Sequence, residues 1–324
     1  MVSNLSPVPV GARLLGDIGG TNARFAWQSD PSAPTTFVER YFCADFESLG
    51  TAIHRYLTSH GLPAPRDCAL GIATPITGDL VKMTNSSWSF SIAALKAQFG
   101  FERLVVINDF TALALALPEL NQTELHPVGC GEAVPGCAKA LIGAGTGLGV
   151  SGLLPEGNGR WVPIAGEGGH VSLAAQTEEE VAVIAQLRAR FGHVSAERVL
   201  SGPGLVNLYE ASAALAMRSP HAFTAEQVLN ASDSDPDCRH AVQWFAAFLG
   251  ATAGDLALTL GARGGVYIGG GIPPRLLPAL KGSAFRARFE GKGRFSSYLA
   301  AIPTWVIVSE HSPALIGAAR ALDR

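Results

Sequence analysis

The segment LLGDIGGTNARFAW (residues 14–27) decides the fold of this chain. Apolar residues stand on both sides of a glycine-rich centre, and this pattern predicts a strand, a tight turn and a second strand that returns antiparallel. Gly19 and Gly20 lack a β-carbon, so the backbone there can turn sharply and approach a ligand closely. Successive backbone N–H groups in such a turn bind anions, and Thr21 and Asn22 add short polar side chains, so a phosphate is the natural guest.

Asp17 stands at the end of the first expected strand, directly before this turn. Carboxylate oxygens are the ligands that Mg²⁺ prefers, so beside a phosphate Asp17 is expected to hold Mg²⁺, directly or through water. A plain hairpin with an incidental aspartate would show the same pattern, because glycine-rich turns are common. This motif alone leaves both interpretations open.

A second segment, ALIGAGTGLGVSGLL (residues 140–154), repeats the design around Thr146 and Gly147. Two glycine-turn hairpins one domain length apart predict two similar lobes, each offering a phosphate loop to one nucleotide in a cleft between them. Neither segment is a Walker loop, because no Gly-Lys-Ser/Thr follows. Neither has the spacing or the strand-to-helix context of a dinucleotide-binding fingerprint.

Composition narrows the class of protein. The 324 residues are 48% hydrophobic and only 16% charged, with a net charge of −3, which fits one large or two ordinary globular domains. No basic run suggests a nucleic-acid partner. The N-terminus has no basic n-region, so no signal peptide is expected, and no window reaches the roughly 18 uncharged apolar residues of a membrane span. The nearest candidate, 241–260, contains Asp255 and is expected to be a buried helix.

The five cysteines are odd in number and form no C-x-x-C pair, a usage typical of reduced thiols in a cytoplasmic protein. Cys130 and Cys137 flank glycines and could pair or bind a metal. The lack of a third or fourth ligand nearby argues against a metal there.

Strands and helices are expected to alternate along the chain, which predicts an α/β fold. The lobe boundary is placed in the connection 119–136. The small α/β domain would then comprise 1–118 plus about 303–324, and the large α/β domain 119–302. Strands are expected at 12–16, 23–28, 36–42, 67–73, 104–107, 161–164, 265–269 and 305–308, and helices at 46–60, 92–99, 110–117, 178–191, 203–216, 224–231, 237–260, 273–280, 283–290 and 312–322.

Asn108 and Asp109 follow a buried strand and precede a helix, where open α/β sheets bind their ligands. A hydroxyl that accepts a phosphoryl group needs a carboxylate to orient it and take its proton, so Asp109 is the candidate base. Asn108 can both donate to and accept from a substrate hydroxyl. Ordinary capping of the following helix would explain the same pair.

Two further carboxylates and a histidine lie in polar segments of the second half. Glu167 and His170 share a loop with three glycines, which can bend both side chains toward a polyhydroxylated ligand. A zinc pair or a plain surface turn is the alternative for these two residues. Glu197 precedes the segment SGPG (residues 201–204) and by itself would be a solvated acid at a helix start. Gly269, Gly270 and Gly271 follow a buried strand and suit close approach by an adenosine or phosphate group, or simply a tight turn.

Taken together, these motifs resemble those of the bacterial-type glucokinases, within the actin/sugar-kinase/Hsp70 superfold, over nearly the whole chain from Leu14 to the last helix. Single motifs are not specific, but six of them in this order are. One departure is the N-terminal extension, residues 1–12, to which no function is assigned. The motifs are GDIGGTNAR (16–24), PITGD (75–79), INDFTA (107–112), GAGTGLG (143–149), GEGGH (166–170) and SAERVLSGPG (195–204).

The resemblance implies a two-lobed, actin-like ATPase fold of the ribonuclease-H-like type, whose lobes close on the sugar, and a cytoplasmic homodimer. It implies a glucose site with Asp109 as the base for the 6-hydroxyl, and Mg²⁺ held near Asp17 through water. A related family carries a zinc-binding cysteine cluster after its Gly-His motif; this chain has none, which argues against that branch and against zinc. By the resemblance, glucose would contact Asn108, Asp109, Glu167, His170 and Glu197, and ATP would contact Gly16, Asp17, Ile18, Gly19, Gly20, Thr21, Asn22, Thr146, Gly147, Gly269, Gly270 and Gly271.

The expected activity is therefore transfer of the γ-phosphoryl group of ATP to the 6-hydroxyl of glucose, which gives glucose 6-phosphate and ADP, the first step of glycolysis. A kinase for another hexose, such as mannose or fructose, remains open, because discrimination among hydroxyls depends on fine geometry. A sugar-binding regulator without catalysis is disfavoured by Asp109 and by both glycine turns. A phosphatase on the same superfold is disfavoured by the combination of Asn108, Glu167 and His170.

Overall fold

The computed structural model describes residues 11–309 and 311–324, so the N-terminal extension lies almost entirely outside the described residues. Internal contacts divide the chain into two compact units, and each is described here by itself. The first unit comprises residues up to 120 together with 309–324, and the second comprises 121–308. The sequence-based boundaries were 118 and about 303.

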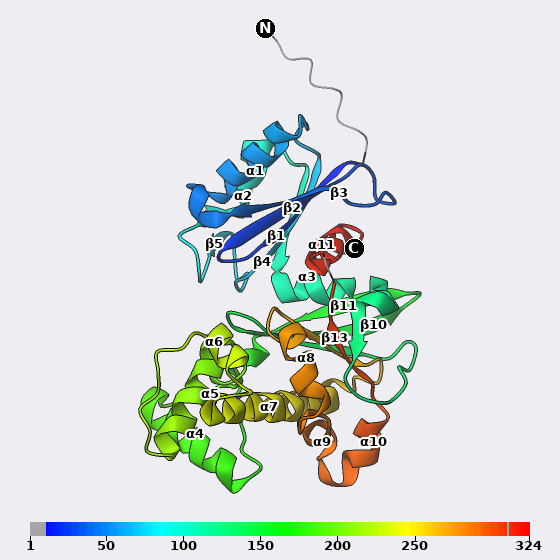
Figure 1. Ribbon diagram of the computed structural model, residues 1–324. Helices are drawn as coiled ribbons and strands as arrows, with labels where there is room; N and C mark the ends of the chain where they lie inside the picture. Colours follow the sequence, from blue (N-terminus) through cyan, green and yellow to red (C-terminus); the bar gives the residue numbers. More distant parts are fainter. Residues whose placement is uncertain (1–10, 310) are drawn as a thin grey trace. The chain divides into compact units, whose positions relative to one another are not determined.

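The first unit is built on a five-stranded sheet in the order β3-β2-β1-β4-β7 (Figure 1). The predicted hairpin is present: β1 (Arg13–Ile18) and β2 (Asn22–Gln28) pair antiparallel on either side of the first glycine turn. A third antiparallel strand, β3 (Thr36–Phe42), pairs with β2. On the other side, β4 (Asp67–Ile72) and β7 (Arg103–Asn108) run parallel to β1.

Alternation along β1 assigns the two faces of this sheet to two helical layers. Leu14 and Leu15 are both fully buried but, as neighbours in a strand, they point to opposite faces. Leu14 belongs to the core on the side of α1 (Leu49–Ser59) and α2 (Ile92–Phe99). Leu15 packs with Leu315 of α11 (Pro313–Leu322), which lies against α3 (Asp109–Ala116) on the other side (Figure 1). A helix from the far end of the sequence thus completes the first unit.

The second unit repeats this plan. Its sheet has the order β11-β10-β9-β12-β13-β8, and without β8 the order and strand directions match those of the first sheet. The second glycine turn joins the first two antiparallel strands of this sheet, as predicted. The strands are β8 (Leu125–Pro127), β9 (Lys139–Ala144), β10 (Leu148–Gly157), β11 (Arg160–Ala165), β12 (Val266–Gly269) and β13 (Thr304–Ile307).

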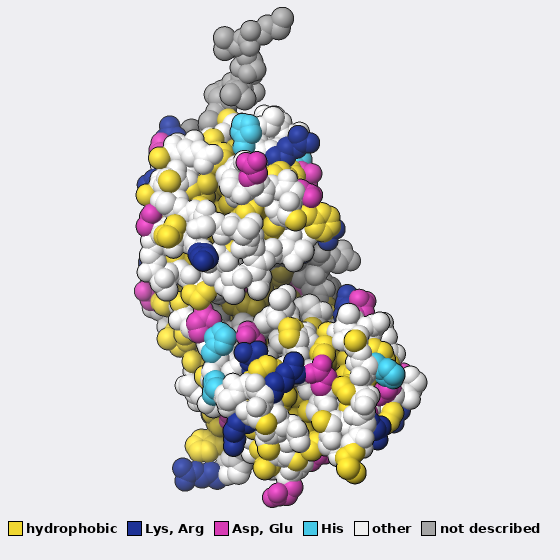
Figure 2. Space-filling model, turned by 90° about the vertical axis from the view of Figure 1, so that its left-hand side faces the viewer, with side chains coloured by type: hydrophobic (Ala, Val, Ile, Leu, Met, Phe, Trp, Pro, Cys, Tyr) yellow, Lys and Arg dark blue, Asp and Glu magenta, His cyan; other side chains and the backbone are white. Residues whose placement is uncertain are grey.

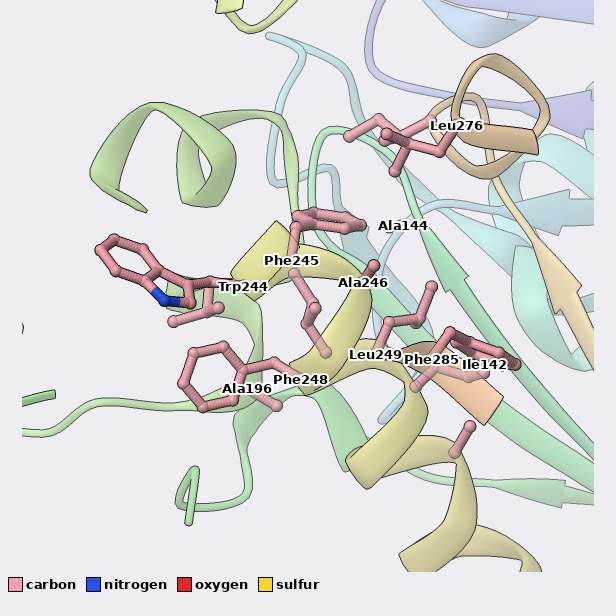
Figure 3. Close-up of a cluster of buried hydrophobic side chains, with 14 of the residues drawn as sticks. Ile142, Ala144, Ala196, Trp244, Phe245, Ala246, Phe248, Leu249, Leu276 and Phe285 are labelled. Atoms are coloured by element: carbon pink, nitrogen blue, oxygen red, sulfur yellow. The ribbon is translucent and has the colours of Figure 1, made fainter. Parts of the chain in front are cut away.

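The helix α7 (Pro236–Leu260) runs through the core of the second unit. It meets the length and composition of a membrane span, but 72% of its apolar window is buried inside the protein, so the prediction of a buried helix is confirmed. Its aromatic side chains Trp244, Phe245 and Phe248 lie in the hydrophobic cluster, as Figure 3 shows. The other helices of this unit are α4 (Glu178–Phe191), α5 (Gly202–Leu215), α6 (Ala225–Asn230), α8 (Pro273–Lys281), α9 (Phe285–Glu290) and α10 (Ser296–Ala300).

Four short elements differ from the sequence-based expectation. The connection 119–136 is not irregular throughout, because it contains β8, which pairs antiparallel with β13. The expected turn and polar loop near 77–91 form a hairpin of β5 (Leu80–Lys82) and β6 (Ser89–Ser91), and α10 was not predicted. Elements of three to five residues are too short to show a period, so only tertiary pairing defines them.

Acidic and basic side chains are interspersed on the face that Figure 2 shows, and no continuous basic stripe is visible there. This distribution agrees with the small net charge of −3.

The contact between α3 and α11 yields a first prediction. A β-carbon at Gly317 would lie 1.6 Å from the Ala112 carbonyl oxygen, which is backbone and cannot move aside. Gly317→Ala should therefore force the two helices apart and cost on the order of 2 kcal/mol or more. Calorimetry should show a clearly lower Tm.

Gly282→Ala is the matched control, since a β-carbon there meets nothing within 4 Å. Equal Tm values for the two variants would contradict the proposed backbone contact.

Candidate active site

One group of candidate residues lies at the edge where three parallel strands of the first sheet end together. Asp17 of β1 lies opposite Gly71 of β4, and Asn108 is the last residue of β7. Because Gly71 has no side chain, α3 approaches the sheet closely: a β-carbon there would lie 3.5 Å from the Asp109 α-carbon. The sheet therefore brings two carboxylates, Asp17 and Asp109, to one edge.

The Asp17 carboxylate is held by two side chains. Its Oδ2 accepts a hydrogen bond from Ser312 Oγ at 2.6 Å and one from Arg24 Nη1 at 3.3 Å. Ser312 directly precedes α11, but its hydroxyl makes no cap hydrogen bond to that helix. Sequence reasoning missed Ser312, because 295 residues separate it from Asp17 and no local pattern distinguishes it from an ordinary capping serine.

Asn108 and Asp109 lie at the start of α3 and have different roles there. Asn108 is the N-cap, and its Oδ1 accepts from the backbone N–H groups of Phe110 at 2.9 Å and Thr111 at 3.3 Å. The capping interpretation is thus right for Asn108, and the helix begins at Asp109, one residue earlier than expected. Only the Asn108 amide nitrogen, 3.5 Å from the Thr74 carbonyl oxygen, remains as a donor for a ligand.

Asp109 has the electrostatics of a base. Burial, and secondly the negative charge of Asp17, raise the pKa of its carboxyl from 3.8 to about 6, although the Phe110 backbone N–H opposes the shift. Such a group is ionised at neutral pH and still basic enough to take a proton from a hydroxyl in a transition state. A perturbed carboxyl beside a second charge is also typical of functional sites.

The first glycine turn packs against the loop that contains Asn85. Gly19 N donates to Asn22 O at 2.8 Å, and a β-carbon at Gly20 would lie 2.6 Å from Asn85 Cβ. Thr21, at the tip, is exposed. The Asn22 Oδ1 atom is buried with no hydrogen-bond partner among the described residues. The turn therefore places backbone groups and one buried, unsatisfied amide oxygen at the end of β1, next to Asp17.

The second glycine turn is joined to the segment that carries Glu197. Gly145 O accepts from Gly202 N, the first residue of α5, at 2.8 Å. Glu197 Oε2 accepts from Leu148 N at 2.9 Å, and a β-carbon at Gly147 would lie only 2.5 Å from the same oxygen. Glu197 is therefore not the solvated acid of the alternative interpretation, because its carboxylate lies against the turn.

Glu167 and His170 lie in the loop that follows β11, and both are exposed. The two glycines between them pack on β10: a β-carbon at Gly169 would lie 2.1 Å from Leu148 O. Backbone pairing of 171–173 with 194–196 fixes this loop beside the segment of Glu197. The structure thus brings Glu167, His170 and Glu197 into one region of the second unit.

A cavity of about 450 Å³ adjoins the second glycine turn within the second unit. Of the three candidate glycines, Gly271 lines this cavity, Gly270 makes the turn with φ of 89°, and Gly269 ends β12. The helical walls were missed, because they come from three separate helices. The lining residues are Gly145, Thr146, Gly202, Pro203, Val206, Ala225, Glu226, Leu229, Gly271, Ile272 and Arg275.

The cysteines form no disulfide in the part of the chain that the structure describes; Cys130 is exposed and Cys137 is half-buried. Across residues 11–309 and 311–324, no three metal-ligating side chains of His, Cys, Asp or Glu come together. A cation held by one carboxylate and by phosphate oxygens needs no such cluster.

Comparison with solved structures identifies the fold and the class of protein. A ROK family glucokinase from Streptomyces griseus, solved in complex with glucose and AMPPNP, shares the fold with a TM-score of 0.66 over 96% of this chain and 99% of that one, at 17% identity. A glucokinase from an Antarctic psychrotroph is more similar, with a TM-score of 0.86, 36% identity and coverage of 97% and 99%. Two α/β units with this strand order and two glycine turns are typical of the actin-like ATPase fold, and the similarity to the psychrotroph enzyme places the chain among the sugar kinases of this fold.

Sequence comparison narrows the class to a family. The family model described as Glucokinase matches residues 14–324. The glucokinase of Aromatoleum aromaticum is 55% identical over 314 residues, which cover 96% of this chain and 94% of that protein. The chain belongs to the glucokinase family, and the predicted resemblance is confirmed.

The raised pKa of Asp109 predicts a stabilising substitution. The folded protein binds the Asp109 proton more tightly than the unfolded chain does, so stability is lost as the pH rises from about 4 to about 6. Asp109→Asn removes this charge and should raise the free energy of unfolding at pH 7.5 by on the order of 2 kcal/mol. Urea unfolding at pH 7.5 and pH 4 measures the difference, which should vanish at the lower pH.

Asp79→Asn is the control of opposite sign. Hydrogen bonds from Ser91 and from the Ala93 backbone N–H lower the pKa of the exposed Asp79 carboxyl, so its loss should not stabilise the protein at pH 7.5. A gain for Asp79→Asn equal to that for Asp109→Asn would contradict the assigned burial effect.

Proposed function

We propose that this protein is an ATP-dependent glucose kinase, which transfers the γ-phosphoryl group of ATP to the 6-hydroxyl of glucose. Membership of the glucokinase family supports this activity. The observation that carries the mechanism is Asp109: a partly buried carboxylate at the end of a strand, whose pKa is raised to about 6. A base in this position meets the requirement of phosphoryl transfer to a hydroxyl.

In the proposed reaction, Asp109 accepts the proton of the glucose 6-hydroxyl while that oxygen bonds to the γ-phosphorus. The bond between the γ-phosphorus and the bridging oxygen breaks, and ADP leaves with the electron pair. Proton transfer of this kind contributes on the order of 10²–10⁴-fold in rate. Burial of Asp109 supports this role, because exclusion of water limits the competing transfer to water.

We propose that the remaining sugar hydroxyls are bound by Asn108, Glu167, His170 and Glu197. The Asn108 amide nitrogen would donate, since its oxygen already caps α3. Carboxylates and an imidazole can accept from or donate to neighbouring hydroxyls, and three such groups lie together in the second unit.

The nucleotide is proposed to use both glycine turns and the cavity. Its phosphates would contact Gly19, Gly20, Thr21 and Asn22 of the first turn, and Thr146 and Gly147 of the second. Gly16 and Ile18 are buried in the sheet and would support the turn from β1. The cavity of about 450 Å³, with apolar side chains from α5 and α6, Ile272 before α8 and Gly271 in its lining, suits an adenosine group.

Mg²⁺ would be held by Asp17, directly or through water. The fit rests on a hard oxygen donor at the end of β1 beside a turn that contains an unsatisfied buried amide, Asn22. Both protein contacts of Asp17 use Oδ2, so Oδ1 takes part in neither. When bound, the ion would neutralise charge on the phosphates. Homodimerisation and a cytoplasmic location are also proposed, on the family resemblance and, for the location, on the cysteine usage.

Asp109→Asn tests the base. The variant should lose about 10²–10⁴-fold in kcat and keep its glucose affinity, because the amide still fills the site but cannot take the proton. In the parent, kcat should fall tenfold per unit as the pH drops below about 6, the pKa of Asp109. Steady-state rates between pH 5 and pH 9 measure both effects, and near-normal turnover of the variant would overturn the assignment.

The substrate is tested by ADP production from ATP and Mg²⁺ with no sugar, glucose, mannose, fructose or N-acetylglucosamine. Glucose should stimulate ADP formation most strongly. Stronger stimulation by another hexose would keep the mechanism and change the substrate. Binding of glucose without any turnover would favour a sugar-binding regulator, and phosphate release from ATP without sugar would favour a phosphatase.

A further inference from the structure

Glu197 is tied to the second glycine turn at its side chain and to α5 at its backbone. Its Oε2 accepts from Leu148 N at 2.9 Å, and its carbonyl oxygen accepts from Ser201 Oγ at 2.8 Å. Ser201 is the N-cap of α5, and the next residue, Gly202, donates to Gly145 O at 2.8 Å. The turn and the segment 197–202 are therefore fastened together at two places.

The close contact extends to Gly147. A β-carbon at this position would lie 2.5 Å from Glu197 Oε2 and 3.4 Å from Glu197 Cδ. The backbone at Gly147 does not have a positive φ, so a left-handed conformation does not explain the glycine. What excludes a side chain at Gly147 is the carboxylate of Glu197.

One carboxylate can serve two partners at once, because its two oxygens together accept about four hydrogen bonds. Oε2 is used by the turn that we assign to phosphate, and Oε1 takes part in neither of these contacts. We infer that Glu197 couples the two substrates: the carboxylate that binds the sugar also fixes the phosphate turn, so each ligand strengthens binding of the other. This inference rests on the proposed sugar role of Glu197.

Such coupling is reciprocal by thermodynamic necessity. If glucose restrains the Glu197 carboxylate, the turn from Thr146 to Leu148 is restrained with it, and the nucleotide loses less freedom on binding. Energetic couplings of this kind usually change affinities by about 5–150-fold. A Glu197 that only stabilised the fold would contribute nothing to this coupling, and its substitution would leave the coupling unchanged.

The decisive variant changes the phosphate turn and substitutes none of the residues proposed to contact the sugar. Gly147→Ala should displace the Glu197 carboxylate and weaken glucose binding about tenfold by calorimetry in the absence of nucleotide, the size of one charge-assisted hydrogen bond. Gly145→Ala is the matched control in the same turn, because a β-carbon there meets nothing within 4 Å. It should bind glucose as the parent does. Thermal melts establish that each variant is folded.

A double-mutant cycle then isolates the link. Glu197→Ala should weaken glucose binding, and adding Gly147→Ala should weaken it no further, since the displaced group is already gone. If Gly147→Ala does not fold, Glu197→Asp tests the coupling instead. Its side chain keeps the charge but is too short to bind both the Leu148 N–H group and the sugar. The ratio of AMPPNP affinities with and without saturating glucose should then fall from at least about fivefold in the parent toward one.

The outcomes separate this inference from the proposed function. Unchanged glucose affinity in Glu197→Ala would refute the proposed sugar role. Weakened binding in Glu197→Ala together with parental binding in Gly147→Ala would refute only the coupling. Equal AMPPNP affinity with and without glucose in the parent would refute the coupling as well.

Discussion

Repulsion between the charges of Asp17 and Asp109 is the constraint around which the first unit is arranged. The sheet brings both carboxylates to one edge, and Asp17 helps to raise the Asp109 pKa. Arg24 and Ser312 both donate to Asp17, which limits the cost of the paired charges. A positive end of α3 also lies beside Asp109, since the helix begins there. Arg24 and Ser312, which offset the negative charge of Asp17, are thus also the residues that hold its carboxylate in position.

Both sheets place a carboxylate near a glycine turn, but they do so with different residues. Each has a glycine turn after its first central strand and a carboxylate near that turn. In the first unit the carboxylate is local, Asp17, only two residues before the turn. In the second unit the strand before the turn has no acid, and Glu197 arrives from a segment about fifty residues later. The two sheets therefore share a strand order but differ in the segment of the chain that supplies the carboxylate near the turn.

The sequence was sufficient where a feature depends on neighbours along the chain. The strand–turn–strand hairpins, the buried α7 and the strand end at Asn108 could be predicted, because period and turn chemistry are local. The same reasoning assigned Glu197 to the site only through its motif; its contact with Leu148 N is tertiary. Ser312, the strand β8 and the helical walls of the cavity were beyond reach for the same reason. Their partners lie far away in sequence, and although the three helices themselves were predicted, no local pattern shows that they meet around one cavity.

The position of α11 has a consequence for synthesis on the ribosome. Leu15, Ala26 and Ala69 form one face of the first sheet, and the side chains that cover them, such as Leu315 and Ala318, follow the whole second unit in the chain. During synthesis, this apolar face of the first sheet therefore stays uncovered until the ribosome has added about two hundred further residues, up to α11. Such exposure invites chaperone binding or aggregation. The order of translation thus places the completion of the edge that carries Asp17 and Asp109 after the synthesis of the second unit.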